Sequence, residues 1–318
     1  MTIITLSIIA VCVIAIVGLV VFSLHVARRV EQALPPQGRF IDIGADRIHY
    51  VEYGNGPPIV FVHGLGGQMR NFAYLHMQDL ARSHRVVLID RPGSGHSTRG
   101  ARSSASMSAQ ARTVAMFIDA MGLNKPVLVG HSLGGAIALA VGLNHPQSVS
   151  RLALIAPLTH MAVPSRAFSG LLIRSSLVRR IVSVTLATPL GIKGSRAVLA
   201  TVFGPDAVPR DFAIKGGGLL GLRPSSFYAA SSDMIAIKDE LPAMEKQYAT
   251  LRLPVDVLYG REDRILDWRH HGEALKRKLD HTTLRLVDGG HMLPVTAPAL
   301  TMEWLQAIAA EPLTTSSL

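Results

Sequence analysis

The stretch Val127–Gly135 constrains the fold more than any other part of the chain. It reads Val-Leu-Val-Gly-His-Ser-Leu-Gly-Gly, a short apolar run that ends in glycines. The β-branched run predicts a buried strand, and the helix-forming residues Ala136–Val141 follow at once. A strand must therefore turn into a helix within about three residues. Gly130 and Gly134 occupy the two positions where a Cβ would collide with neighbouring backbone.

Ser132 stands at the centre of this turn and is a candidate nucleophile. The pattern G-x-S-x-G is typical of a nucleophile elbow, in which a strained turn pushes the serine hydroxyl outward. The N-terminus of the following helix would favour an anion formed beside the serine. Glycine-rich strand ends also occur in α/β proteins without such chemistry, so the motif needs support from the rest of the chain.

The N-terminus carries a long apolar segment. Residues 3–24 include no charged side chain, and a helix of that length, at about 1.5 Å per residue, spans a hydrocarbon core of about 30 Å. We expect one membrane anchor over residues 1–27 that contacts the lipid bilayer through residues 3–24. A cleaved signal peptide is the alternative, but its basic start and cleavage site are missing. Arg28 and Arg29 follow, which favours the cytoplasmic face for the main domain.

The charge balance limits the possible partners. Lys and Arg number 32 against 22 Asp and Glu, which gives a net charge of +10. The arginines are scattered and aromatic residues make up only 5% of the chain, so we expect no nucleic-acid partner. Attraction to anionic lipid fits an anchored protein, and a charge balance without a specific partner is the alternative. The one cysteine, Cys12, lies in the anchor and leaves the redox compartment undetermined.

Short apolar strands alternate with helical stretches along most of the chain. A β-hairpin is predicted over Arg39–Tyr53. Further strands are predicted at Pro58–Val62, Arg85–Asp90, Val127–Val129, Ser150–Ala156, Leu253–Gly260 and Thr283–Asp288, and helices at Ser108–Leu123, Trp268–Leu279 and Ala299–Ala310. This alternation predicts a parallel sheet with helices on both faces. Ligands bind at the carboxyl ends of such strands, where the glycine-rich loops converge.

Residues 161–250 break this alternation. The segment is rich in Leu, Val and Ile, is interrupted by prolines and shows no strand pattern, so we interpret it as an inserted helical cap. Arg174, Arg179 and Arg180 fall on different sides of a helical wheel drawn over Phe168–Leu186, which argues against a clean amphipathic surface helix. The predicted segments are an anchor (1–27), a linker (28–38), a first core part (39–160), the cap (161–250) and a second core part (251–318).

A serine nucleophile needs a base, and the base needs a carboxylate partner. His291 follows a predicted strand in a Gly-Gly turn where the loops converge, and it is our candidate base. His270 and His271 lie within a helical pattern and His281 lies just before a strand, so these three fit less well.

Asp263 is our candidate acid, because it comes three residues after Gly260 at the end of a strand. Glu262 and Asp267 are neighbours that could substitute for it. A surface ion pair with Arg261 or Arg264, worth little in stability, is the alternative without catalysis.

A tetrahedral oxyanion also needs hydrogen-bond donors, and backbone amides suit this role. We expect them to come from Leu133, directly after the nucleophile, and from Leu65 in the loop after an early strand. His63, in that same loop, is predicted to brace it. The glycines of residues 90–97 do not follow the G-x-G-x-x-G spacing of a dinucleotide site. The histidines at 63, 96 and 131 have no other metal-binding residues near them in the sequence. We therefore expect no cofactor and no metal.

With these residues in place, the sequence resembles the α/β-hydrolase family. The resemblance runs from about residue 39 to residue 311. It is carried by His63–Gly67, Asp90–Ser97, Gly130–Gly134, Gly260–Asp263 and Gly290–His291. It implies an eight-stranded, mostly parallel sheet, a triad of Ser132, Asp263 and His291, and a helical cap after the sixth strand.

The resemblance also bears on the reaction. Family members with Asp at the elbow are epoxide hydrolases and haloalkane dehalogenases, whereas Ser132 indicates acyl chemistry. The anchor and apolar cap look like those of membrane-bound bacterial lipases and phospholipases. We expect a membrane-anchored serine hydrolase of acyl esters, with lipids and lysophospholipids as candidate substrates. A C–C bond hydrolase or cofactor-free perhydrolase with the same triad, and a non-catalytic receptor or scaffold, are the alternatives, and a homodimer is left open.

Overall fold

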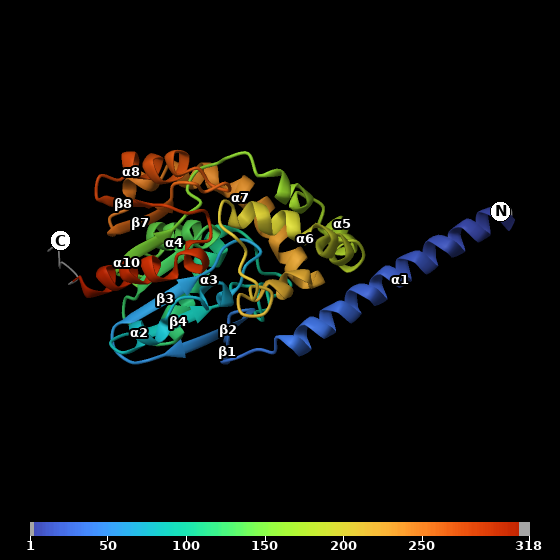
Figure 1. Ribbon diagram of the computed structural model, residues 1–318, viewed down its shortest axis with the longest axis horizontal. Helices are drawn as coiled ribbons and strands as arrows, with labels where there is room; N and C mark the ends of the chain where they lie inside the picture. The colour runs from blue at the N-terminus through green and yellow to red at the C-terminus, as the bar shows by residue number, and fades with distance from the viewer. Residues whose placement is uncertain (1–2, 312–318) are drawn as a thin grey trace.

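The computed structural model describes residues 3–311, so the ends of the first and last predicted segments, 1–2 and 312–318, lie outside the described residues. An eight-stranded sheet forms its centre, in the order β1-β2-β4-β3-β5-β6-β7-β8 (Figure 1). Strand β2 is antiparallel to β1 and β4, and all other neighbouring strands are parallel. The predicted eight-stranded, mostly parallel sheet is confirmed.

The strands agree closely with the apolar runs of the sequence. They are β1 (Arg39–Ile43), β2 (Asp46–Tyr53), β3 (Pro58–Val62), β4 (Arg85–Ile89), β5 (Val127–His131), β6 (Arg151–Ile155), β7 (Val255–Gly260) and β8 (Thr282–Val287). Strands β3 to β7 are covered on both faces, which explains why most of their residues are apolar and do not alternate with polar ones.

Helices cover both faces of the sheet. One apolar cluster includes residues of α3 (Met107–Ala120), α4 (Leu133–Asn144) and α8 (Ala274–Lys278), and the other includes residues of α2 (Met77–Ala81) and α10 (Pro298–Ala310). Shorter elements are η1 (Met69–Phe72), η2 (Pro146–Ser148), α9 (Leu293–Thr296) and η6 (Arg269–Glu273), a π-helical turn before α8. Helix α4, which begins directly after Ser132, is buried from Leu133 to Gly142, as its apolar sequence requires.

Only helical elements lie between β6 and β7. They are η3 (Arg166–Leu171), α5 (Ser176–Val184), α6 (Ala187–Phe203), η4 (Gly218–Leu222), α7 (Pro224–Glu245) and η5 (Tyr248–Thr250). Helices α5, α6 and α7 gather at one end of the sheet (Figure 1). We call residues 161–250 the cap segment.

The expectation that Phe168–Leu186 forms no clean amphipathic helix is wrong for its central part. Helix α5 spans only Ser176–Val184 and is strongly amphipathic. Arg174 precedes the helix, so its place on the wheel carried no information.

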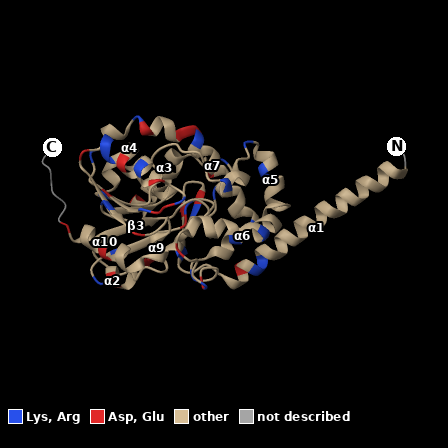
Figure 2. Cartoon of the chain, turned by 45° about the horizontal axis from the view of Figure 1, so that its top comes forward, with Lys and Arg blue, Asp and Glu red and all other residues tan. Residues whose placement is uncertain are grey.

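Helix α1 (Ile3–Ala33) projects from the body as one continuous helix (Figure 1). Residues 28–33, predicted as linker, are helical because they are good helix formers and the first proline comes only at Pro35. The helix is long and apolar enough to cross a membrane, and no residue of its apolar window is buried in the structure. Figure 2 shows no charged residue along its projecting part.

The C-terminal part of α1 packs on the cap segment. Val30 and Leu34 form a small apolar cluster with Leu220 of η4. The buried Ser23 hydroxyl donates a hydrogen bond to the carbonyl oxygen of Thr185, at 3.2 Å. Ser23 therefore marks the point where α1 changes from a free helix to a docked one.

Candidate active site

Ser132 lies on the sharp turn between β5 and α4. Its backbone has φ +56° and ψ −118°, a conformation that costs a side-chain-bearing residue about 1–3 kcal/mol. A Cβ on Gly130 would collide with the carbonyl oxygen of Gly134, and a Cβ on Gly134 would collide with that of Val62. The two glycines therefore fill the positions that the sequence assigned to close backbone contact.

His291 and Asp263 form the hydrogen bond expected of a base and its acid. His291 Nδ1 lies 2.7 Å from Asp263 Oδ2, and the two side chains are almost completely buried. The other oxygen, Oδ1, accepts hydrogen bonds from the backbone amides of Ile265 and Leu266 at 2.8 and 2.9 Å. A carboxylate only accepts, so Nδ1 carries the imidazole proton and Nε2 stays free to take another.

The competing histidines lie elsewhere. His270 is exposed and its Nε2 contacts the carbonyl oxygen of Met161 at 2.8 Å. His271 is buried, and its Nδ1 accepts from two backbone amides. His281 is exposed before β8.

The competing acids do not contact the ring of His291. Glu262 is exposed, and Asp267 accepts a hydrogen bond from the amide of Arg269. Within residues 3–311, Asp263 is the one side chain hydrogen-bonded to the ring of His291.

Ser132 and His291 line the same cavity, of about 790 Å³. No hydrogen bond joins the Ser132 hydroxyl to His291 among the described residues, so the structure places the two groups in one site without the contact that proton transfer needs. His131, next to Ser132 in the sequence, contacts the backbone of His291. Its Nε2 donates to the carbonyl oxygen of His291 at 3.0 Å. Burial, with the nearby His291, lowers the pKa of His131 to about 3, so its ring stays neutral.

The loop after β3 packs directly against Ser132. A Cβ built on Gly64 would lie 3.0 Å from the Ser132 Cβ and 3.4 Å from its hydroxyl oxygen. The two predicted oxyanion donors, Leu65 and Leu133, both line the cavity. Leu133 is the first residue of α4, so its amide has no carbonyl partner within the helix.

A buried arginine fixes this loop. The Gly64 carbonyl oxygen accepts from Arg91 Nη2 at 2.9 Å, from His63 Nδ1 at 2.9 Å and from the amide of Gly67 at 3.2 Å. The peptide bond that follows is trans and planar, so the Leu65 amide points in the opposite direction to that carbonyl.

His63 completes the same arrangement. Its Nε2 accepts from the backbone amide of Arg91 at 3.0 Å. Burial and the Arg91 guanidinium lower the pKa of His63 to about 3, which keeps the ring neutral and Nε2 able to accept. These contacts fit a bracing residue.

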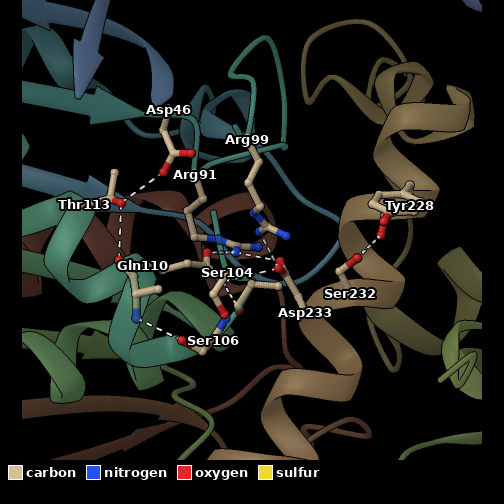
Figure 3. A network of polar contacts seen from close by, with 12 residues as sticks. Asp46, Arg91, Arg99, Ser104, Ser106, Gln110, Thr113, Tyr228, Ser232 and Asp233 are labelled. Carbon is tan, nitrogen blue, oxygen red and sulfur yellow. Dashed lines mark hydrogen bonds and ion pairs between the residues drawn. The ribbon is translucent and has the colours of Figure 1, made fainter. Parts of the chain in front are cut away.

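Asp233 connects the same arginine to the cap segment. Arg91 Nη1 lies 2.8 Å from Asp233 Oδ2, and Arg99 Nη2 lies 2.6 Å from Asp233 Oδ1. Gln110 of α3 accepts from Arg91 Nη1 at 2.6 Å. Figure 3 shows these side chains converging between the core and α7. Sequence reasoning missed Asp233, because no motif surrounds it and its partners lie 134 and 142 residues away.

Apolar side chains of the cap segment make up most of the cavity wall. They include Phe168, Leu190, Leu199, Phe212, Phe227, Met234 and Ile237. Polar side chains also line the cavity, and two of them, Gln68 and Asn71 of the core, donate to the carbonyl oxygen of Gly216. Among residues 3–311, no group of three or more His, Cys, Asp and Glu side chains is placed to hold a metal ion.

Comparison with known proteins identifies the class. The family described as the alpha/beta hydrolase fold matches residues 57–298, so the chain belongs to the α/β-hydrolase family. Haloalkane dehalogenase 2 of Mycobacterium bovis is 27% identical over 277 residues, 84% of this chain and 93% of that protein.

One further relative matches only part of this chain, and one solved structure matches nearly all of it. The dihydrolipoyllysine-residue acetyltransferase component of the acetoin cleaving system of Pseudomonas putida is 36% identical over 128 residues, 40% of this chain and 34% of that protein. The chain thus spans about a third of that relative. The crystal structure of a membrane phospholipase A superposes with a TM-score of 0.69 and 24% identity over 96% of each chain. At this identity the likeness shows the fold.

Proposed function

We propose that this chain is a membrane-anchored serine hydrolase of carboxylic esters. The observation that carries the proposal is the strained serine at 132, which shares one cavity with a histidine held by a buried carboxylate. The strain is the mark of a nucleophile elbow, and a residue that only shaped the turn would be glycine. The triad, which a binding module has no need of, counts against a receptor or scaffold.

In the proposed reaction the Ser132 hydroxyl attacks the ester carbonyl while His291 Nε2 takes its proton. Asp263 stabilises the imidazolium that results. The amides of Leu65 and Leu133 donate to the tetrahedral oxyanion. His291 then gives its proton to the leaving alcohol, and water attacks the acyl-enzyme by the same route. The hydrogen bond from the Ser132 hydroxyl to His291 Nε2 forms when substrate binds, since such contacts often tighten only in the complex.

The proposed substrates are esters with long acyl chains, including phospholipids and lysophospholipids. The apolar wall contributed by the cap segment 161–250 supports this class, because apolar burial favours a chain by about 0.8 kcal/mol for each CH₂. Helix α1, proposed to span the bilayer, would hold the enzyme where such substrates occur. Arg28 and Arg29 favour the cytoplasmic side for the catalytic body. The similarity to a membrane phospholipase A agrees with this choice.

The test is a hydrolysis profile over p-nitrophenyl esters of increasing chain length and over phospholipids. We expect activity that rises with chain length and that disappears in Ser132→Ala. Ser195→Ala is the matched control, because Ser195 lines the same cavity on α6 and bonds only to its own helix. Full activity in purified Ser132→Ala would overturn the proposal.

A further inference from the structure

Helix α5 turns its apolar side outward and its polar side inward. Leu177, Val178 and Ile181 are 67%, 48% and 53% exposed. At about 100° per residue they fall within one arc of about 100°, and Arg179 and Ser183 fall on the opposite side. A helix that faces water has the reverse arrangement.

The inward polar side is fully engaged. Arg179 donates from Nε to the Ser231 hydroxyl at 3.1 Å, from Nη1 to the Ser232 hydroxyl at 3.0 Å and from Nη2 to the carbonyl oxygen of Ile173 at 2.6 Å. These bonds to α7 fix the rotation of α5. The outward position of its leucine, valine and isoleucine is therefore set by the fold and does not depend on their own contacts.

The position of α5 along α1 indicates where this apolar surface would lie relative to a bilayer. Ile3–Phe22, the projecting part, has 20 residues and a length of about 30 Å, equal to a hydrocarbon core. The next residue, Ser23, bonds to Thr185 at the end of α5. If α1 spans a bilayer, α5 lies at the level where the hydrocarbon ends.

The start of α6 continues the same surface. Leu186, just before α6, and Leu190 and Ile192 are 44%, 59% and 42% exposed. Leu190 also lines the cavity, as does Val163, which is 94% exposed, so the cavity opens at this side of the protein.

The surrounding charge is of one sign. Between residues 161 and 205 the chain has six basic residues and no acidic one. Arg180, Lys193 and Arg196 are exposed beside the apolar residues. Basic residues around an apolar face attract anionic lipid head groups, at about 1 kcal/mol for each residue near the surface.

We propose that the α5–α6 surface, formed by Leu177, Val178, Ile181, Leu186, Leu190 and Ile192, inserts into the interface of an anionic bilayer beside α1. This inference rests on the proposed span of α1. It implies that the cavity opens toward lipid, so that an acyl chain enters the site from the bilayer without crossing water.

The test uses the full chain in phosphatidylcholine vesicles with and without phosphatidylglycerol. In a Cys12→Ser background, a single environment-sensitive NBD label is attached through Ile181→Cys. The control label is attached through Met116→Cys on α3, which is 46% exposed on the core. We expect the label at 181 to show blue-shifted emission and quenching by lipids with a nitroxide on the acyl chain, more strongly in anionic vesicles. The control label should show neither.

Two results would overturn the proposal. One is a label at 181 that stays in water and is quenched freely by iodide. The other is a label at 181 that is shielded from iodide and from nitroxide lipid alike and crosslinks to a second copy, because this surface would then be a dimer contact.

Activity gives an independent measure. Ile181→Asp should lower hydrolysis of vesicle phospholipid about tenfold, because a charge replaces an inserted apolar group, and should leave hydrolysis of p-nitrophenyl butyrate in solution unchanged. Met116→Asp should change neither. Equal hydrolysis of vesicle lipid by Ile181→Asp and by the unsubstituted protein would count against insertion. A chain that hydrolyses neither substrate would refute the proposed function, and the label positions would still decide whether the surface inserts.

Discussion

The core and the cap segment use opposite means to build one site. In the core, buried hydrogen bonds hold the polar groups: three donors surround the Gly64 carbonyl oxygen, and three surround the Asp263 carboxylate. In the cap segment, apolar side chains line the cavity on one side and face outward on the other. Under the proposed function, this difference means that the core would supply the catalytic groups and the cap segment would select the molecule that reaches them.

Asp233 is the main exception to this division. It is a buried charge of the cap segment that holds Arg91, and through Arg91 the loop that carries the Leu65 amide. The comparison therefore predicts that polar changes in the core abolish chemistry, that changes at the Asp233 contact weaken it, and that apolar changes in the cap segment alter substrate choice.

The largest effect is expected for Asp263→Asn. The amide would favour the wrong tautomer of His291, which lowers kcat by about 10⁴ in triads of this kind. Steady-state hydrolysis of p-nitrophenyl butyrate measures the loss. Asp267→Asn is the matched control and should lower kcat less than about twofold, since Asp267 accepts only from a local amide. An equal loss of kcat in both variants would contradict the assignment of Asp263 as the acid.

A smaller effect is expected for Asp233→Asn. The change leaves Arg91 and Arg99 without their anion, and breaking a buried pair costs about 3–5 kcal/mol of folding stability. Because Arg91 also orients the Gly64–Leu65 peptide, kcat should fall about tenfold or more with little change in KM, as in the loss of an oxyanion donor. Thermal unfolding and kinetics measure the two effects. Asp239→Asn, an exposed pair on the same helix, serves as the control. Unchanged kcat at lower stability would show a purely structural role.

Filling the cavity should change selectivity alone. Leu199→Trp adds volume to the apolar wall, so we expect hydrolysis of long-chain esters to fall about tenfold, the equivalent of one or two lost CH₂ contacts. Hydrolysis of p-nitrophenyl butyrate should stay within about twofold of the original. The ratio of the two rates is the measurement. Equal losses for both esters would mean that the substitution disturbs the catalytic groups.

The smallest effect concerns pH. Burial lowers the pKa of His63, His131 and His271 to about 3, against about 6.5 in the unfolded chain. Between these values the unfolded state binds more protons, so stability falls as the pH drops below 6.5, and it is insensitive to these groups above that pH. Each group should cost about 1 kcal/mol at pH 5.5.

Urea unfolding at pH 7.5 and pH 5.5 measures this dependence. His271→Asn should lose about one group's share of it, and the exposed His281→Asn should lose none. An unchanged difference in His271→Asn would contradict the assignment.

Short-range stereochemistry made much of the core predictable. Gly130 is required by a contact with Gly134, four residues later, and the candidate groups follow strand ends that apolar runs reveal. Gly134 belongs to the same short motif, although the backbone it faces, at Val62, is distant in the sequence. The orientation of α5 was not predictable, because Arg179 finds its partners 52 and 53 residues later, on α7. The Arg91–Asp233 contact was hidden for the same reason. The C-terminal part of α1 packs on η4, about 190 residues away along the chain, and no local pattern indicates that contact.

The central claim, that Ser132 is the nucleophile, is tested most directly by covalent labelling. The full chain is treated with a fluorophosphonate, and the modified peptide is identified by mass spectrometry. The account predicts one adduct per chain, on Ser132, which is lost in His291→Ala because the hydroxyl then has no base. An unmodified Ser132, or an adduct on another residue, would contradict it.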